Sequence, residues 1–262
     1  MVGTAIQLQT LESLSEDVPE TIARVGQTTL EGVEFAGLDE TPPETVVEAL
    51  VHSSLEPIGA HVDLARLEDE YETVVDTYDT IGCRRLIVAD RHVEAFTSLT
   101  GVERLANRMN RLSKQLSADR FDLVYHNDMI EFESIDGELA YDIFVNALDD
   151  EIALEIDTGL AQYAGVNPIA LLERVADRVE LVHLTDTVPG SGATVNVELG
   201  AGELDVEACV EAARSAGVEW IVYEHSKTSD PTDSLAHAES RLSMLCHGSD
   251  DSRAAGTAHS TD

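Results

Sequence analysis

The sequence alternates short apolar segments with segments of helical periodicity, and this alternation constrains the fold more than any single motif. Eight of the apolar segments have the length and the turn-residue boundaries of β-strands. They are Ala5–Thr10, Gly32–Ala36, Pro57–Val62, Arg85–Asp90, Phe121–Asn127, Ile152–Asp157, Val179–Asp186 and Trp220–His225. Eight strands that alternate with helices predict a parallel sheet with right-handed crossovers, which closes into a barrel.

Helical periodicity fills the intervals between these strands. The expected helices include Leu64–Ile81, Val102–Leu116, Pro168–Val175 and Val206–Ala216. Capping residues precede two of them, Asn167 before Pro168 and Asp205 before Val206. A doubly wound open sheet is the competing arrangement, but it requires a glycine-rich phosphate turn after the first strand. The Gln7-Leu8-Gln9-Thr10 segment contains no glycine.

The length of 262 residues suits one (β/α)8 TIM barrel, an α/β fold that commonly forms a single domain. We expect the barrel to span residues 1–247, since the alternation leaves no room for a linker between domains. Residues 248–262 are rich in Ser, Asp, Ala, Gly and Thr and lack periodicity. They are therefore expected to form a disordered acidic and polar tail.

The chain is strongly acidic: 51 Asp and Glu oppose 16 Lys and Arg, for a net charge of −35. Such a charge repels phosphate backbones, so we expect neither a nucleic-acid partner nor an anionic membrane surface. The acid is distributed along the chain, and only Lys114 and Lys227 are lysines. This composition favours a halophilic origin with high internal salt, where screening removes the self-repulsion. With no signal peptide or membrane span and no disulfide spacing, the expected location is the cytoplasm.

Metal-capable side chains stand at the ends of the last four predicted strands. Asp157, His183 and Glu224 end strands six, seven and eight, whereas strand five offers either His126 or, from the following loop, Glu131. A parallel barrel gathers the C-terminal ends of its strands at one mouth. Carboxylates and imidazoles brought together there would bind a divalent cation and leave positions open for a substrate.

Other polar residues occupy equivalent strand ends and are expected to line the same mouth. We expect Gln7, Glu34, His61, Asn127 and Asp186 to bind the substrate, although Asp186 is equally suited to hold the His183 tautomer. Asp157 also has the alternative role of capping the next helix. The glycine-containing segment from Glu198 to Asp205 is expected to form a flexible loop, which is a candidate lid over the mouth.

Short motifs along almost the whole chain, to about Leu245, resemble the sugar phosphate isomerase/epimerase family of xylose isomerase-like TIM barrels. The matching segments are Ile6-Gln7-Leu8-Gln9-Thr10-Leu11, Gly32-Val33-Glu34-Phe35, Gly59-Ala60-His61, Tyr125-His126-Asn127, Glu155-Ile156-Asp157, Val182-His183-Leu184, Leu199-Gly200-Ala201-Gly202-Glu203-Leu204-Asp205 and Gly217-Val218-Glu219-Trp220. Each is short, but their order and spacing together are specific. The chain departs from the family at Asp128, Leu160 and Thr185, and His126 replaces the strand-five acid of the epimerases.

The resemblance implies a divalent cation held by a strand-five group, Asp157, His183 and Glu224, and proton transfer next to a carbonyl. Mn²⁺ is the expected cation, with Mg²⁺, Co²⁺ or Zn²⁺ as alternatives. The expected activity is isomerisation or epimerisation of a small sugar or polyol ketone through an enediolate. Glu224 is the expected base and Glu131 the reciprocal acid.

Three other functions remain open. An inosose dehydratase-like lyase would expel water from the same enediolate. An endonuclease IV-like enzyme would need more metal ligands and a basic groove, and a non-catalytic barrel would have little reason to keep buried charges. The resemblance is also compatible with a homo-oligomer.

Overall fold

Eight parallel strands form a closed barrel in the computed structural model, which describes residues 2–190 and 196–247. The strands follow one another around the barrel in the order β1-β12-β9-β8-β5-β4-β3-β2. Their bounds are β1 Gly3–Gln7, β2 Gly32–Phe35, β3 Glu56–His61, β4 Arg85–Val88, β5 Asp122–His126, β8 Ala153–Asp157, β9 Val179–Leu184 and β12 Trp220–Tyr223. The predicted (β/α)8 barrel is therefore confirmed. The predicted tail at 248–262 lies outside the described residues.

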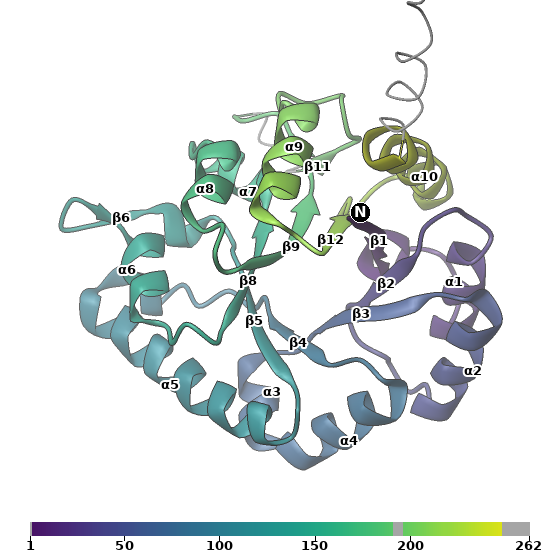
Figure 1. Cartoon of the computed structure of the whole chain (residues 1–262), viewed down its shortest axis with the longest axis horizontal. Helices are drawn as coiled ribbons and strands as arrows, with labels where there is room; N and C mark the ends of the chain where they lie inside the picture. Colours follow the sequence, from purple (N-terminus) through teal and green to yellow (C-terminus); the bar gives the residue numbers. More distant parts are fainter. Residues whose placement is uncertain (1, 191–195, 248–262) are drawn as a thin grey trace, which may run out of the picture.

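Helices surround the barrel and cover its outer face (Figure 1). They are α1 Val18–Val25, α2 Pro43–Ser53, α3 Leu64–Asp69, α4 Tyr71–Ile81, α5 Leu99–Ala118, α6 Ala140–Ala147, α7 Thr158–Tyr163, α8 Pro168–Arg174, α9 Val206–Ala216 and α10 Pro231–His247. The predicted caps are present: the Asn167 side chain accepts from the first amides of α8, and that of Asp205 accepts from Ala208 N.

Two predicted elements differ from the structure. The first strand ends at Gln7, and a 3₁₀ helix over Leu8–Leu11 takes the place of its predicted last residues. The helix predicted over 64–81 is divided into α3 and α4 at Glu70, whose φ of −122° and ψ of 29° are not helical. No proline or glycine marks this break in the sequence, so periodicity alone extends the helix through it.

Two short antiparallel pairs lie outside the barrel sheet. β6 (Ser134–Ile135) pairs with β7 (Glu138–Leu139), and β10 (Asp186–Thr187) pairs with β11 (Asn196–Val197). The second pair ties the segment after β9 to the segment that leads into α9.

The apolar core has two parts, one on each side of the barrel wall. The larger lies between the strands and the helices. The smaller fills the interior of the barrel near the N-terminal ends of the strands, and its buried members are Ala5, Ile58, Ile87, Val124, Ala153, Leu181 and Val222. We call this second group the barrel floor.

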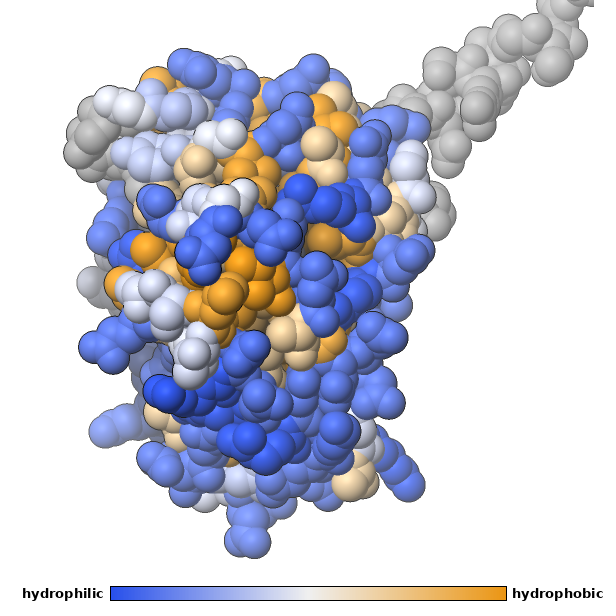
Figure 2. All heavy atoms as spheres, turned by 90° about the vertical axis from the view of Figure 1, so that its left-hand side faces the viewer, coloured by the Kyte–Doolittle hydropathy of each residue, from blue (hydrophilic) through white to orange (hydrophobic). Residues whose placement is uncertain are grey.

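The outer surface shown in Figure 2 is mostly hydrophilic, with a smaller group of hydrophobic residues near its centre. None of the described helices combines the length and the apolarity that crossing a membrane requires.

Candidate metal centre

A layer of polar side chains lies directly above the barrel floor. Successive inward-facing residues of a strand are two positions apart, so the residue two places after a floor residue also faces the interior. On five strands this places a polar residue above an apolar one: Gln7 above Ala5, His126 above Val124, Glu155 above Ala153, His183 above Leu181 and Glu224 above Val222. Period-two alternation thus converts dispersed sequence positions into one polar layer.

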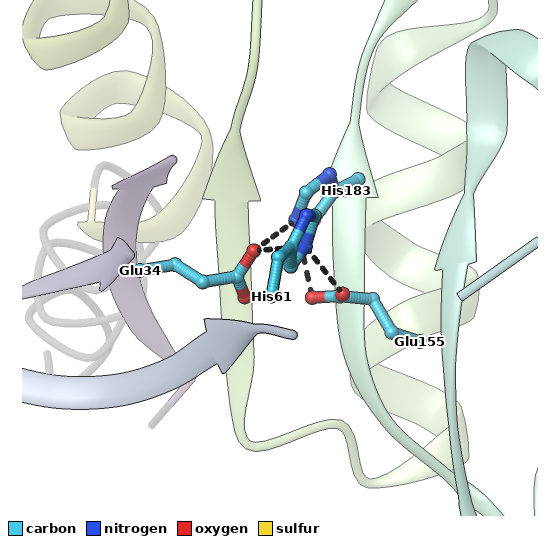
Figure 3. Close-up of side chains that lie close together, drawn as sticks. All are labelled: Glu34, His61, Glu155 and His183. Carbon is cyan, nitrogen blue, oxygen red and sulfur yellow. Dashed lines mark hydrogen bonds and ion pairs between the residues drawn. The ribbon is translucent and has the colours of Figure 1, made fainter. Parts of the chain in front are cut away.

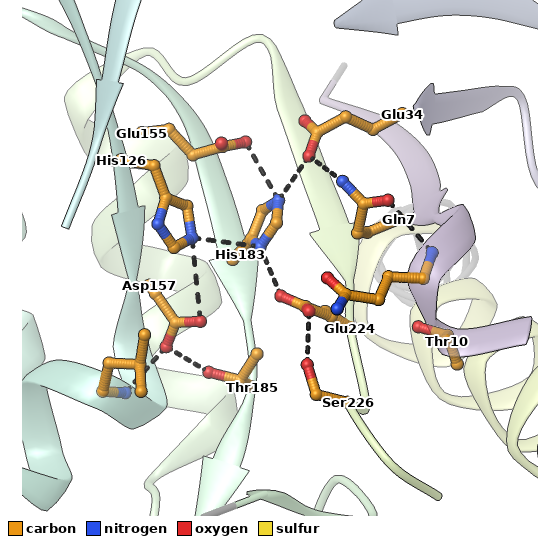
Figure 4. Close-up of polar contacts among 12 residues, drawn as sticks. Gln7, Thr10, Glu34, His126, Glu155, Asp157, His183, Thr185, Glu224 and Ser226 are labelled. Atoms are coloured by element: carbon orange, nitrogen blue, oxygen red, sulfur yellow. Dashed lines mark hydrogen bonds and ion pairs between the residues drawn. The ribbon is translucent and has the colours of Figure 1, made fainter. Parts of the chain in front are cut away.

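Three of these side chains, His126, His183 and Glu224, form a compact group with Asp157, which follows Glu155 by two residues. We call these four residues the upper cluster. One ligand atom from each lies within 4.8 Å of the others, and all four residues are buried. His183 Nδ1 is 2.9 Å from Glu224 Oε2 and 3.3 Å from His126 Nε2. His126 Nε2 is 3.9 Å from Asp157 Oδ2. Figure 4 shows the four side chains converging from their separate strands.

A second group lies against the other edge of the same imidazole and is called the lower cluster: Glu34, His61 and Glu155, which share His183. His183 Nε2 is 2.8 Å from Glu34 Oε1 and 3.2 Å from Glu155 Oε1 (Figure 3). His61 Nε2 is 2.8 Å from Glu34 Oε1 and 3.6 Å from Glu155 Oε2. Burial alone would lower the pKa of His61, but the two carboxylates outweigh it and raise the pKa to about 9.

His183 therefore links the two clusters through its two ring nitrogens. A histidine that binds a metal through one nitrogen commonly donates the N–H of the other to a carboxylate, which fixes the tautomer and the ring orientation. In the lower cluster both Glu34 and Glu155 are placed to accept this N–H. Neighbouring carboxylates raise the pKa of His183 well above its usual range, so a cation in the upper cluster would have to replace the proton that Nδ1 shares with Glu224.

Further hydrogen bonds hold the upper carboxylates in place. Asp157 Oδ1 accepts from the Thr185 hydroxyl at 2.5 Å and from Leu160 N at 2.7 Å. Asp157 is thus the N-cap of α7 through one oxygen, and its other oxygen faces His126, so both roles expected for it are compatible. Glu224 Oε1 accepts from the Ser226 hydroxyl at 2.5 Å, which leaves Oε2 to His183.

Burial and neighbouring charges shift the protonation of the upper cluster. Burial raises the pKa of Asp157 to about 7, and the charge of Glu224 adds to the increase. Burial also favours neutral Glu224, but the hydrogen bond and charge of His183 outweigh it and hold that pKa at about 2. Burial lowers the pKa of His126 well below its usual range. The cluster therefore combines the neutral imidazole of His126, the ionised carboxylate of Glu224, the carboxyl group of Asp157, which titrates near neutrality, and His183, whose pKa the neighbouring carboxylates raise.

The donor set fits a divalent cation. Two imidazole nitrogens and two carboxylate oxygens are ligands that Zn²⁺, Mn²⁺ and Co²⁺ accept in proteins. Four buried carboxylates, Glu34, Glu155, Asp157 and Glu224, face only three histidines within the two clusters. Buried carboxylates require compensating positive charge, which a bound cation would supply.

The remaining predicted site residues have other partners. Among the described residues Glu131 is not a member of either cluster, and its carboxylate accepts a hydrogen bond from the hydroxyl of Tyr125. Tyr125 precedes His126 on β5 and so faces outward, where its ring packs edge-on against Phe144 of α6. Glu131 therefore lies on the opposite side of the barrel wall from the upper cluster, and His126 is the strand-five residue that joins it.

Asp186 holds the loop that the sequence marks as a candidate lid. Its carboxylate accepts backbone N–H groups at 2.8 to 3.0 Å from Thr187, Gly200, Gly202 and Leu204. Among the described residues, Asp186 thus holds the backbone of this loop and not the His183 imidazole.

Gln7 and Asn127 position neighbouring site residues. Gln7 Nε2 donates to Glu34 Oε1 at 2.7 Å, and Asn127 Oδ1 accepts from Asp157 N at 3.1 Å. Gln7 therefore orients a carboxylate of the lower cluster, whereas Asn127 holds the backbone at Asp157. The sequence did not predict that Thr185 and Ser226 hold the carboxylates of Asp157 and Glu224. Its only indication is a hydroxyl residue two positions after His183 and two positions after Glu224.

Sequence comparison with known proteins finds only local similarity. No protein-family model matches the chain. An inosose dehydratase of Clostridium botulinum (strain Alaska E43 / Type E3) is 36% identical over 87 residues, 32% of this chain and 28% of that protein. The similarity thus spans less than a third of that relative.

Solved structures match over nearly the full chain. A sugar phosphate isomerase/epimerase from Parabacteroides distasonis ATCC 8503 superposes with a TM-score of 0.77 and 15% identity, covering 92% of this chain and 98% of that one. The IolI protein with a bound zinc atom superposes with a TM-score of 0.78 and 14% identity, covering 93% and 98%. The chain is therefore similar in fold to the sugar phosphate isomerases/epimerases and other xylose isomerase-like TIM barrels, as its sequence motifs imply.

Proposed function

We propose that the protein is a divalent-metal-dependent isomerase or epimerase of a small sugar or polyol ketone. The observation that carries this proposal is the upper cluster, in which His126, Asp157, His183 and Glu224 present one ligand atom each within 4.8 Å of one another. Mn²⁺ is the cation we expect, with Mg²⁺, Co²⁺ or Zn²⁺ as alternatives; the zinc atom bound in the IolI structure supports a divalent ion in this fold. When bound, such a cation supplies Lewis acidity that stabilises the negative charge of an enediolate.

The residues of the chain would bind the cation and move the proton. We assign the base to Glu224, because Ser226 holds one of its oxygens and the carboxylate stays ionised at neutral pH. The reciprocal acid needs access to the mouth, which argues against Glu131 behind β5. His61 suits that role better, because its side chain is 16% exposed whereas those of Glu34 and Glu155 are fully buried.

A lyase that resembles inosose dehydratase is the second candidate. The local similarity to inosose dehydratase favours it, since the same enediolate can expel a β-hydroxyl group as water. The two reactions differ in product mass: an isomerase conserves the mass of its substrate, and a lyase product is lighter by one water.

Metal content is the first test, measured on protein purified in molar KCl. We expect about one equivalent of a divalent metal in the wild type from the upper cluster, and its loss in Asp157→Ala and Glu224→Ala variants that stay folded by circular dichroism. Glu173→Gln, on the exposed face of α8, is the matched control and should keep its metal. Wild-type protein that binds no divalent metal in any form would end the proposal.

A substrate screen in D₂O then separates the two reactions. Ketoses and inososes are incubated with metal-loaded protein, and the products are analysed by mass. A product that keeps the substrate mass, apart from the mass added by deuterium from the solvent, supports the isomerase, and loss of water supports the lyase. Metal binding with neither outcome for any hydroxy-ketone would contradict both.

A further inference from the structure

One helix reverses the charge of the rest of the protein. In a chain with a net charge of −35, helix α5 carries four basic residues, Arg104, Arg108, Arg111 and Lys114, against a single acid, Glu103. No other α-helix among those the structure describes has a net positive charge. Helix α5 thus contains four of the 16 basic residues of an otherwise acidic protein.

Three arginines converge on a cavity at the start of this helix. The segment between β4 and α5, together with the first turns of α5, lines a cavity of about 560 Å³ that is open to solvent. Arg91, Arg104 and Arg108 line it, with one acid, Glu94, among the other lining residues. The volume lies in the range of small-molecule binding sites, about 300–1,000 Å³.

The arginines retain donors that protein contacts do not use. Arg108 binds Glu68 through both sides of its fork, with Nε–Oε1 at 3.1 Å and Nη2–Oε2 at 2.7 Å. Arg91 Nε lies 3.0 Å from Asp128 Oδ2, and within the described part of the chain its other side-chain nitrogens make no ion pair. Arg104 makes no ion pair or hydrogen bond with its side chain to any residue in the ranges 2–190 and 196–247. A guanidinium presents a planar set of donors that matches phosphate and carboxylate groups.

The cavity wall is fixed by close packing of the backbone. A Cβ atom on Gly101 would lie 2.3 Å from the carbonyl oxygen of Ala95, so the first turn of α5 can approach the preceding segment only with glycine there. Ser98 caps the helix by accepting from Gly101 N at 3.2 Å. These contacts set the position of Arg104 one turn along the helix.

The cavity lies at the same end of the barrel as the upper and lower clusters. Its segment follows the C-terminal end of β4, and Arg91 contacts Asp128, two residues after His126. It does not include any member of the upper or lower cluster.

We propose that this cavity is a binding site for the phosphate or carboxylate group of a small anion, with Arg104 and Arg91 as its principal donors. The site does not depend on the proposed isomerase activity. The anion is either a group of the substrate itself or a separate effector, since both offer the same chemistry to the arginines.

Titration with inorganic phosphate tests the site, with KCl adjusted to keep the ionic strength constant. We expect a saturable rise in melting temperature for the wild type and, because hydrogen bonds to charged groups are strong, a Kd weakened by about 10- to 100-fold in Arg104→Ala. Arg111→Ala is the matched control, because Arg111 is on the same helix but does not line the cavity. Its Kd should equal that of the wild type.

Two further variants make the result specific. Arg91→Ala should weaken phosphate binding like Arg104→Ala, which excludes a local folding defect of α5 as the cause. Asp157→Ala should bind phosphate like the wild type, so the site is separable from the upper cluster whether or not that cluster binds metal. Equal loss in Arg104→Ala and Arg111→Ala, a non-saturable response, or loss in Asp157→Ala would overturn the proposal.

Inhibition of turnover by phosphate would identify the source of the anion, once a substrate is known. Competitive inhibition that Arg104→Ala relieves indicates a group of the substrate, and non-competitive inhibition that the same variant relieves indicates an effector. Either pattern supports the site.

Discussion

The imidazole of His183 and the carboxylate of Glu155 lie 3.2 Å apart, with both side chains fully buried and placed on adjacent strands of the barrel. This contact, with that of Glu34, directs Nε2 of His183 away from the upper cluster and Nδ1 towards it.

Replacing Glu155 by Gln should therefore weaken metal binding without removing a ligand. Loss of the partner of a metal-binding histidine typically lowers affinity by about 10- to 100-fold, and we expect a decrease of that size. Competition with a chromophoric chelator measures it, with the exposed Glu173→Gln as the control. An affinity equal to that of the wild type would show that Glu155 does not orient His183.

Replacing Asp186 by Asn should loosen the loop that precedes α9. The carboxylate accepts four backbone N–H groups, and its loss should lower the free energy of unfolding by about 1–3 kcal/mol. Hydrogen exchange of the amides of Gly200, Gly202 and Leu204 should accelerate more than that of the barrel strands. Asp177→Asn, at an exposed position, should leave both quantities unchanged. Unaltered exchange in the Asp186 variant would mean that other contacts hold the loop.

The carboxylate of Glu198 should stabilise the protein at neutral pH and lose this effect in acid. Burial tends to raise its pKa, but hydrogen bonds from His225, Ser234 and Tyr223 outweigh burial and lower it to about 2. Since the pKa of the folded state lies below the ordinary value, the contribution is present above that value and disappears as the pH falls towards 2.

Chemical denaturation of the wild type and Glu198→Gln at several pH values tests this expectation. The wild type should be more stable at pH 7, and the difference should shrink below about pH 4.5, the ordinary pKa of a glutamate. Comparing the two proteins at each pH cancels the acid-dependent repulsion that they share. A difference that is independent of pH would refute the assignment.

Glu131 should have the opposite pH dependence. Burial raises its pKa to about 7, although the hydroxyl of Tyr125 opposes the shift. The folded state then binds a proton more tightly than the unfolded state, so this contribution is present in acid and is lost as the pH rises through about 7. Glu131→Gln should gain stability relative to the wild type between pH 5 and 8, whereas the exposed Glu133→Gln should not. A parallel pH profile for the wild type and Glu131→Gln would contradict the raised pKa.

The barrel could be predicted from the sequence because each strand is an apolar run that ends in polar residues. Once the topology is parallel and closed, the ends of β8, β9 and β12 must meet, which brings Asp157, His183 and Glu224 together without further information. The choice of His126 over Glu131 depends on a 3₁₀ turn over Ile130–Phe132 and on an outward-facing tyrosine. Neither feature can be recognised from the periodicity of the sequence.

Other details depend on long-range contacts that no local pattern encodes. The carboxylate of Asp186 could serve an imidazole, a substrate or a loop, and only the approach of Gly200 and Gly202, 14 and 16 residues later, decides between them. The arginine cavity was equally hidden, because Arg91 is separated by a turn and a short 3₁₀ helix from the arginines of α5.

The apolar floor makes the interior of the barrel a dead end. Ala5, Val124, Leu181 and their neighbours seal it from below, so ions, water and any reactant must enter and leave through the same opening. If a cation and a second molecule both reached the clusters by this one route, the one that entered last would have to leave first. A product would therefore have to depart before the next molecule arrives, and a cation beneath it would be trapped for as long as the product stays.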